Sequence, residues 1–151
     1  YILGILFQGK FAQDQIKATL NSMKSCTIII NFGNTNNQDL VRKESITPND
    51  AGCLQYIEDF LAERGFKNEI LTYGRVKNLW SINRKPGPLL VFLGHVDVVP
   101  TGPVDQWDHD PFSGHDDGTY INGRGTGDMK GGIACFMSAL SRLNPDDFNF
   151  H

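Results

Sequence analysis

The sequence predicts an α/β fold in which helices flank a mixed sheet. Three observations lead to this prediction. Residues 89–94 form an apolar run closed by a glycine, which is typical of a buried strand inside a parallel sheet. Two segments with strand-like sequence precede that run, at 68–73 and 78–83. Apolar side chains recur at helical spacing over 54–61 and 133–143, so helices are expected before and after the strands.

Composition limits the kind of protein this can be. The chain has 151 residues, enough for one domain with its own core. Its net charge of −3 gives no basic surface for nucleic acid or an anionic membrane, and no apolar run is long enough to cross a bilayer. The three cysteines are odd in number and widely spaced, which favours reduced thiols over disulfides. We therefore expect a cytoplasmic protein that binds neither nucleic acid nor membranes.

The N-terminal segment, residues 1–37, is not assigned to a domain, and the main unit is predicted to cover 38–151. Within the first segment, a loose helical pattern covers 10–25. A β-branched run at 26–32 predicts a short strand, and an asparagine-rich stretch at 33–38 predicts a polar break. The segment contains no motif with a known chemistry.

The remaining elements follow from local signals. Residues 47–50 combine a hydroxyl, a proline and an acid in the order typical of a helix start, and Gly65 is expected to end that helix. A proline-rich turn is expected at 84–88. Residues 98–118 form a long irregular loop, and loops of this length in small domains are usually functional. A short strand is expected at 119–122.

His95 and Asp97 follow the apolar run directly. Side chains alternate along a strand, so these two are expected to point to the same side, at the carboxyl end where open α/β sheets bind ligands. An imidazole oriented by a neighbouring carboxylate is a common zinc ligand. The alternative is that the two side chains only satisfy each other's hydrogen bonds, and the residues alone do not decide between these readings.

A glycine-rich segment, Gly123–Gly132, precedes the last predicted helix. It lacks the ending of a phosphate-binding loop, and no acidic residue follows at the distance a dinucleotide requires, so nucleotide binding is disfavoured. The glycines instead allow a tight bend, and Asp128 falls at the helix entrance. Together, His95, Asp97 and Asp128 have the composition of half of a two-zinc hydrolytic site.

At this point the sequence resembles a known family of zinc hydrolases. The similarity extends over about residues 38–143 and is carried in order by Ser45–Cys53, 78–80, Gly94–Pro100, Trp107 with Pro111 and Phe112, and Gly123–Gly132. These segments are similar to the signatures of the aminoacylase, acetylornithine deacetylase, carboxypeptidase and succinyl-diaminopimelate desuccinylase superfamily, and most similar to the desuccinylases.

The resemblance implies a role for each of the three residues. His95 would bind one zinc ion, Asp128 would bridge two, and Asp97 would orient His95 as the catalytic-site acid. Cobalt could replace zinc. The implied reaction is amide hydrolysis of N-succinyl-LL-2,6-diaminopimelate to succinate and LL-diaminopimelate in lysine biosynthesis. The related deacylases, which act on acetylornithine or peptides, and a non-catalytic fragment are the alternatives.

The resemblance also implies parts that this sequence does not contain. The family has a general-base glutamate, further carboxylate and histidine ligands, and an inserted dimerisation domain, all beyond the matched segments. After Asp128 the only acids are Asp146 and Asp147, and neither they nor His151 match a motif. The expected structure is the N-terminal part of the catalytic domain, without the dimerisation domain. We expect little or no hydrolysis from this polypeptide alone, because two ligands cannot complete the centre.

Four other polar residues lie in the long loop or beside the predicted bend. His109 and His115 lie in the long loop between acids, where they are more typical of solvated side chains than of metal ligands. Arg124 and Lys130 flank the predicted bend. They could contact a substrate carboxylate, but charge pairing near Asp128 is the preferred interpretation.

Overall fold

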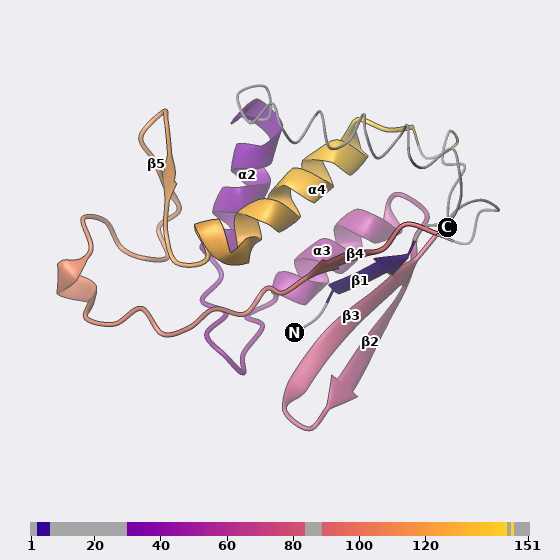
Figure 1. The fold of residues 1–151 in the computed structure, drawn as a ribbon, viewed down its shortest axis with the longest axis horizontal. Helices are drawn as coiled ribbons and strands as arrows, with labels where there is room; N and C mark the ends of the chain where they lie inside the picture. The colour runs from indigo at the N-terminus through magenta and orange to yellow at the C-terminus, as the bar shows by residue number, and fades with distance from the viewer. Residues whose placement is uncertain (1–2, 7–29, 84–88, 145, 147–151) are drawn as a thin grey trace.

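The computed structural model describes residues 3–6, 30–83, 89–144 and 146. A four-stranded sheet has the order β2-β3-β1-β4 (Figure 1). Its strands are β1 (Leu3–Leu6), β2 (Lys67–Tyr73), β3 (Val76–Ile82) and β4 (Phe92–Gly94). β1 runs parallel to β3, whereas β1–β4 and β2–β3 are antiparallel pairs. The sheet is therefore mixed, and the predicted α/β class is confirmed.

The helices are α2 (Ile30–Val41), α3 (Cys53–Ala62) and α4 (Gly131–Ser141). α2 packs beside α4, and α3 packs against β2 and β3 (Figure 1). The apolar stripe predicted for the last helix is buried in the core, which confirms its packing role. Gly65, with φ +80°, follows the end of α3 as predicted. Within the described residues, no helix is long and apolar enough to cross a membrane.

The predicted buried strand at 89–94 is wrong in extent and in place. β4 has three residues and lies at one end of the sheet. Leu93 is 61% exposed, whereas Phe92 stacks on Phe136 of α4 with ring centroids 4.2 Å apart. Only alternate side chains of β4 therefore face the helices. A continuous apolar run does not distinguish burial on one face from burial on both, and this caused the error.

The chain before residue 47 also differs from the prediction. Residues 30–32, predicted as strand, and 33–38, predicted as a polar break, both lie inside α2. Short β-branched runs fit helices as well as strands, and tertiary packing decides between them. The predicted helix at 10–25, residues 26–29 and the turn at 84–88 lie outside the described residues. The division of the chain at residue 38 stays a prediction.

The predicted helix start at 47–50 is a turn that precedes the helix. α3 begins only at Cys53. The Asp50 carboxylate accepts a hydrogen bond from the backbone N–H of Gly52 at 3.1 Å, which closes the turn. The Thr47 hydroxyl, predicted to cap the helix, instead donates to Asp97 at 2.6 Å. The prediction of a helix start at 47–50 is therefore wrong, because the segment forms a turn and the hydroxyl has a partner 50 residues away.

Two short strands complete the described structure. β5 (His115–Asp116) pairs with β6 (Ile121–Asn122) in a separate antiparallel hairpin. β6 falls within the strand predicted at 119–122, whereas β5 was expected to be part of the long loop. That loop also contains a single 3-10 turn at Val104–Gln106. The hairpin leads into the glycine-rich segment, so it brings the chain from the long loop to Asp128.

Candidate functional site

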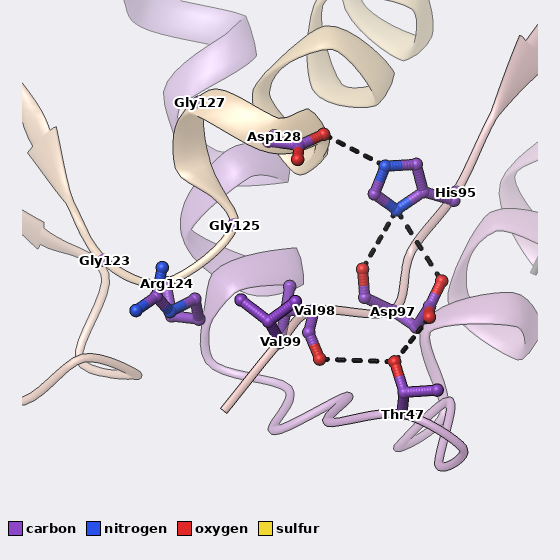
Figure 2. A pocket seen from close by; sticks show the side chains of 10 residues that line it. All are labelled: Thr47, His95, Asp97, Val98, Val99, Gly123, Arg124, Gly125, Gly127 and Asp128. Carbon is purple, nitrogen blue, oxygen red and sulfur yellow. Dashed lines mark hydrogen bonds and ion pairs between the residues drawn. The ribbon is translucent and has the colours of Figure 1, made fainter. Parts of the chain in front are cut away.

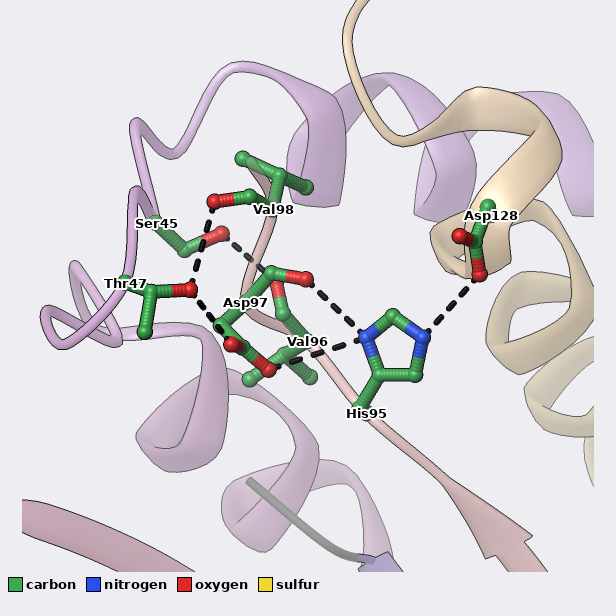
Figure 3. Close-up of polar contacts among 7 residues, drawn as sticks. All are labelled: Ser45, Thr47, His95, Val96, Asp97, Val98 and Asp128. Atoms are coloured by element: carbon green, nitrogen blue, oxygen red, sulfur yellow. Dashed lines mark hydrogen bonds and ion pairs between the residues drawn. The ribbon is translucent and has the colours of Figure 1, made fainter. Parts of the chain in front are cut away.

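A second segment runs beside the chain that follows β4. Ile46 forms a parallel bridge with Val98, and the Val98 N–H donates to the Ser45 carbonyl at 2.9 Å. The buried Ser45 hydroxyl donates to the Val96 carbonyl at 2.6 Å. Val96 and Val98 point into the protein and are buried, whereas His95 and Asp97 between them are partly exposed. The predicted alternation is thus confirmed, with His95 and Asp97 on one side (Figure 3).

Loss of the Ser45 hydroxyl is expected to destabilise the segment that carries the site. In Ser45→Ala the carbonyl of Val96 keeps its burial but loses its partner, so the free energy of unfolding should fall by roughly 1–2 kcal/mol. Urea unfolding measures the change. Ser141→Ala is the control, because that hydroxyl bonds within its own helix to Ser138 and should contribute less than about 0.5 kcal/mol. Equal losses in the two variants would contradict the assignment.

The imidazole of His95 is held through Nδ1. This nitrogen lies 3.0 Å from the backbone carbonyl oxygen of Asp97 and 3.6 Å from Oδ1 of the Asp97 side chain (Figure 3). Both neighbours are acceptors, so Nδ1 carries a proton and donates it. In a neutral ring, this leaves the lone pair on Nε2. The ring orientation and its tautomer are therefore set by Asp97, mainly by its carbonyl.

Nε2 of His95 faces Oδ1 of Asp128 at 3.0 Å. A lone pair on Nε2 and the electron pairs of a carboxylate are both negative, so their approach requires a positive charge between or beside them. A second proton on the ring or a divalent cation can supply that charge. The Asp128 side chain is 89% exposed, so its other side is open to further groups.

Asp97 is the more buried of the two acids. Partial burial by itself raises the pKa of its carboxyl group. The hydrogen bond from Thr47 and nearby positive charge, that of His95 included, outweigh this effect and hold the pKa below its ordinary value. Asp97 is therefore an anion at neutral pH, and its negative charge lies 3.6 Å from the protonated Nδ1 of His95.

A sharp bend in the glycine-rich segment brings Asp128 to His95. Gly125 has φ +90°, and its carbonyl accepts the N–H of Lys130 at 2.8 Å across Thr126–Lys130, a kinked segment in which Asp128 and Met129 have non-helical backbone angles. The Lys130 side chain is fully buried, and its ammonium donates to the carbonyls of Leu40 at 2.8 Å and Lys43 at 2.7 Å. Burial lowers its pKa. Lys130 thus holds the bend against the end of α2. The expected charge pairing of Lys130 with Asp128 is wrong, because the ammonium donates to these two carbonyls instead.

A cavity of about 360 Å³ opens beside these groups, a volume suited to a small molecule. It is lined by Thr47, His95, Asp97, Val98, Val99, Gly123, Arg124, Gly125, Gly127 and Asp128 (Figure 2). The lining comes from three segments: the turn before α3, the chain after β4 and the glycine-rich bend. All three predicted site residues therefore lie in one cavity wall.

The two loop histidines lie outside this cavity lining. The rings of His109 and His115 stack on each other, with centroids 3.7 Å apart and planes 30° apart. Across the described part of the chain, no group of three or more His, Cys, Asp or Glu side chains is arranged to hold a metal ion. Nε2 of His95 and Oδ1 of Asp128 bring two suitable donors together, and their roles as ligands stay a prediction.

Sequence reasoning missed Ser45 and Thr47 as parts of the site. Both act through contacts with residues about fifty positions away, Ser45 with Val96 and Thr47 with Asp97. No spacing rule in the sequence indicates such a contact. The parallel bridge between Ile46 and Val98, which creates it, forms only in the folded chain. The nearest signal was the similarity of the segment Ser45–Cys53 to the family.

Comparison with known proteins agrees with the resemblance. Residues 91–151 match the sequence model of Peptidase family M20/M25/M40. A succinyl-diaminopimelate desuccinylase from Hydrogenovibrio crunogenus is 54% identical over 107 residues, which cover 70% of this chain and 28% of the relative. The enzymes of that name from Legionella pneumophila and Marinobacter nauticus are 49% and 47% identical over the same shares. The chain thus spans less than a third of the length of these relatives, and its resemblance to one part of this family is confirmed.

Proposed function

We propose that this chain, as part of a protein of the M20/M25/M40 peptidase type, supplies half of a zinc centre for amide hydrolysis. The proposed substrate is N-succinyl-LL-2,6-diaminopimelate, which water would convert to succinate and LL-diaminopimelate. The names of the similar proteins support this choice of substrate. The carrying observation is the approach of Nε2 of His95 to Oδ1 of Asp128, two unlike zinc donors whose electron pairs need a positive charge.

The two donor atoms that this chain brings together both suit zinc. Zinc accepts imidazole nitrogen and carboxylate oxygen, and His95 and Asp128 present one of each. In the proposal, His95 binds one ion and Asp128 bridges two, with cobalt as a possible substitute. A hydrolytic zinc ion takes about three protein ligands, so further donors must join these two. The general base of the reaction must likewise come from outside the described residues.

The metal would supply a polarised carbonyl and a water of lowered pKa. This chain's own residues orient the two donor atoms. The carbonyl and carboxylate of Asp97 keep the proton on Nδ1 of His95, so that Nε2 keeps its lone pair toward the cavity. Thr47 fixes the Asp97 carboxylate from its other side at 2.6 Å. The bend at Gly125 sets the position of Asp128.

The isolated polypeptide should bind zinc through His95 and hydrolyse the substrate at little or no rate. Two ligands give weak binding, and no described residue acts as the base. Zinc content after equilibrium dialysis and release of succinate measure the two properties. His95→Ala should reduce zinc retention by at least about 10-fold, because loss of an outer-shell partner alone typically costs about 10- to 100-fold. His115→Ala is the matched control, because His115 is a partly exposed histidine outside the cavity lining.

Two results would contradict this proposal. One is equal zinc retention by wild type and His95→Ala, which would remove the ligand role. The other is stoichiometric binding of two zinc ions with turnover by the 151-residue chain, which would show a complete centre. Comparing acetylornithine with succinyl-diaminopimelate in a full-length version tests the related deacylase activity, because the succinyl group carries a carboxylate that the acetyl group lacks.

The same proposal includes the substrate class, the oligomeric state, the location of the reaction and the partners. The substrate would be a small N-acyl amino acid, and the full-length protein would act as a homodimer. The reaction would take place in the cytoplasm, which is consistent with the free thiols of Cys53 and Cys135. Neither nucleic acid nor a membrane is proposed as a partner, given the net charge of −3.

A further inference from the structure

The cavity that contains His95 and Asp128 has an uneven distribution of charge. Two of the ten lining residues, Asp97 and Asp128, are carboxylates, and Arg124 is the one arginine or lysine among the ten. In Figure 2, Val98 and Val99 lie between Arg124 and Asp97. The cavity therefore has a cationic part and an anionic part with an apolar wall between them.

Arg124 is held in place without a carboxylate. Its Nη2 donates to the Thr101 carbonyl at 3.3 Å, and its guanidinium carbon lies 5.0 Å from the centroid of the Trp107 ring. Trp107 is itself fixed by a hydrogen bond from its indole N–H to the same carbonyl at 3.1 Å. The guanidinium group is thus oriented by a carbonyl and an aromatic face, which leave its positive charge uncompensated.

The hydrogen-bonding capacity of Arg124 is also largely unused. Among the described residues, no acid lies within ion-pair distance of its guanidinium group. Its Nε is buried and has no hydrogen-bond partner among them. A guanidinium has five N–H donors, and the carbonyl of Thr101 occupies only one. An arginine that served only to anchor the long loop would be expected to use more of them.

We propose that Arg124 binds a carboxylate of the small molecule that occupies this cavity. The neutral amide group of that molecule then faces His95 and Asp128, where a carboxylate would be repelled by Asp97 and Asp128. This inference rests on the proposed function for the kind of ligand, an N-acyl amino acid with a free carboxylate. It adds a specificity-determining residue to the site, because planar guanidinium groups bind carboxylates through paired hydrogen bonds.

Titration calorimetry without added zinc tests the proposal, with succinamate, which has one carboxylate and one amide, as the charged probe and succinamide, the diamide, as its uncharged counterpart. The 151-residue chain should bind succinamate at least about tenfold more tightly than succinamide, because only succinamate offers Arg124 a carboxylate. Arg124→Gln should weaken succinamate binding by about tenfold or more and leave succinamide binding unchanged. Arg75→Gln, the same charge change on an exposed turn outside the cavity, is the control.

Equal succinamate affinity of wild type and Arg124→Gln would overturn the proposal, as would a wild type that does not bind succinamate. A second measurement covers the case in which Arg124→Gln fails to fold. Succinamate should shift the side-chain ¹⁵N resonances of Arg124 in the wild type and not those of Arg75, and absence of this shift counts against the proposal. Because no zinc is present, a negative calorimetry result does not contradict the ligand role of His95. A negative zinc-retention result, in turn, does not contradict carboxylate binding by Arg124.

Discussion

Replacement of Lys130 by methionine should lower the free energy of unfolding by roughly 2–3 kcal/mol. Methionine keeps most of the buried aliphatic chain but cannot donate to the carbonyls of Leu40 and Lys43. Each carbonyl then loses a charge-assisted hydrogen bond worth about 1.5–3 kcal/mol and keeps its backbone donor, the N–H of Lys43 or of Ser45. Relief from burying an ammonium group reduces the total. Lys130→Ala should lose more, roughly 3–5 kcal/mol, because it also leaves a cavity. Urea unfolding of the chain measures both losses.

The control for Lys130 is another lysine on the surface. Lys77 has a half-exposed side chain and one ion pair of 3.9 Å with Asp50, so Lys77→Ala should change stability by less than about 1 kcal/mol. If Lys130→Met were as stable as the wild type, the cost of burying the ammonium would equal the gain from its two hydrogen bonds. Lys130 would then not stabilise the bend through those bonds. Its contribution would come only from the packing of its aliphatic chain.

The elements that could be predicted are those whose signal is local and long. The stripe of α4 and the strands β2 and β3 have clear periodicities, and they form close to the predicted bounds. β4 and α2 were mispredicted because their short apolar or β-branched runs fit more than one structure. For β4, the number of covered faces depends on the neighbours of the strand, which no local pattern contains.

In the candidate site, too, local features could be predicted from the sequence and contacts between distant segments could not. The alternation of His95 and Asp97 is a local property of an extended chain, so their common side could be predicted. The convergence of His95 and Asp128 was expected from the family resemblance, and they lie 3.0 Å apart. The contact of Thr47 with Asp97 and the burial of Lys130 were not foreseen. Both connect distant segments, and both depend on how the bend and the turn before α3 pack together.

Gly125→Ala should destabilise the chain by about 3 kcal/mol. Gly125 has φ +90°, a conformation that costs an L-residue roughly 1–2 kcal/mol. A Cβ at this position would lie 2.6 Å from Cγ1 of Val98 and 3.2 Å from Cδ of Lys130, so the neighbours must move. Overpacking of this kind adds about 1–3 kcal/mol. Since the bend at Gly125 positions Asp128, zinc retention should fall together with stability.

Gly127 provides a control two residues away in the same bend. A Cβ at Gly127 would have no atom within 4 Å, and its φ does not require glycine. Gly127→Ala should therefore leave the free energy of unfolding within about 0.5 kcal/mol of the wild type, or raise it slightly through a less flexible unfolded chain. If both variants lost the same stability, the bend would tolerate no side chain anywhere. The close packing of Gly125 on Val98 would then not be the reason that this segment is rich in glycine.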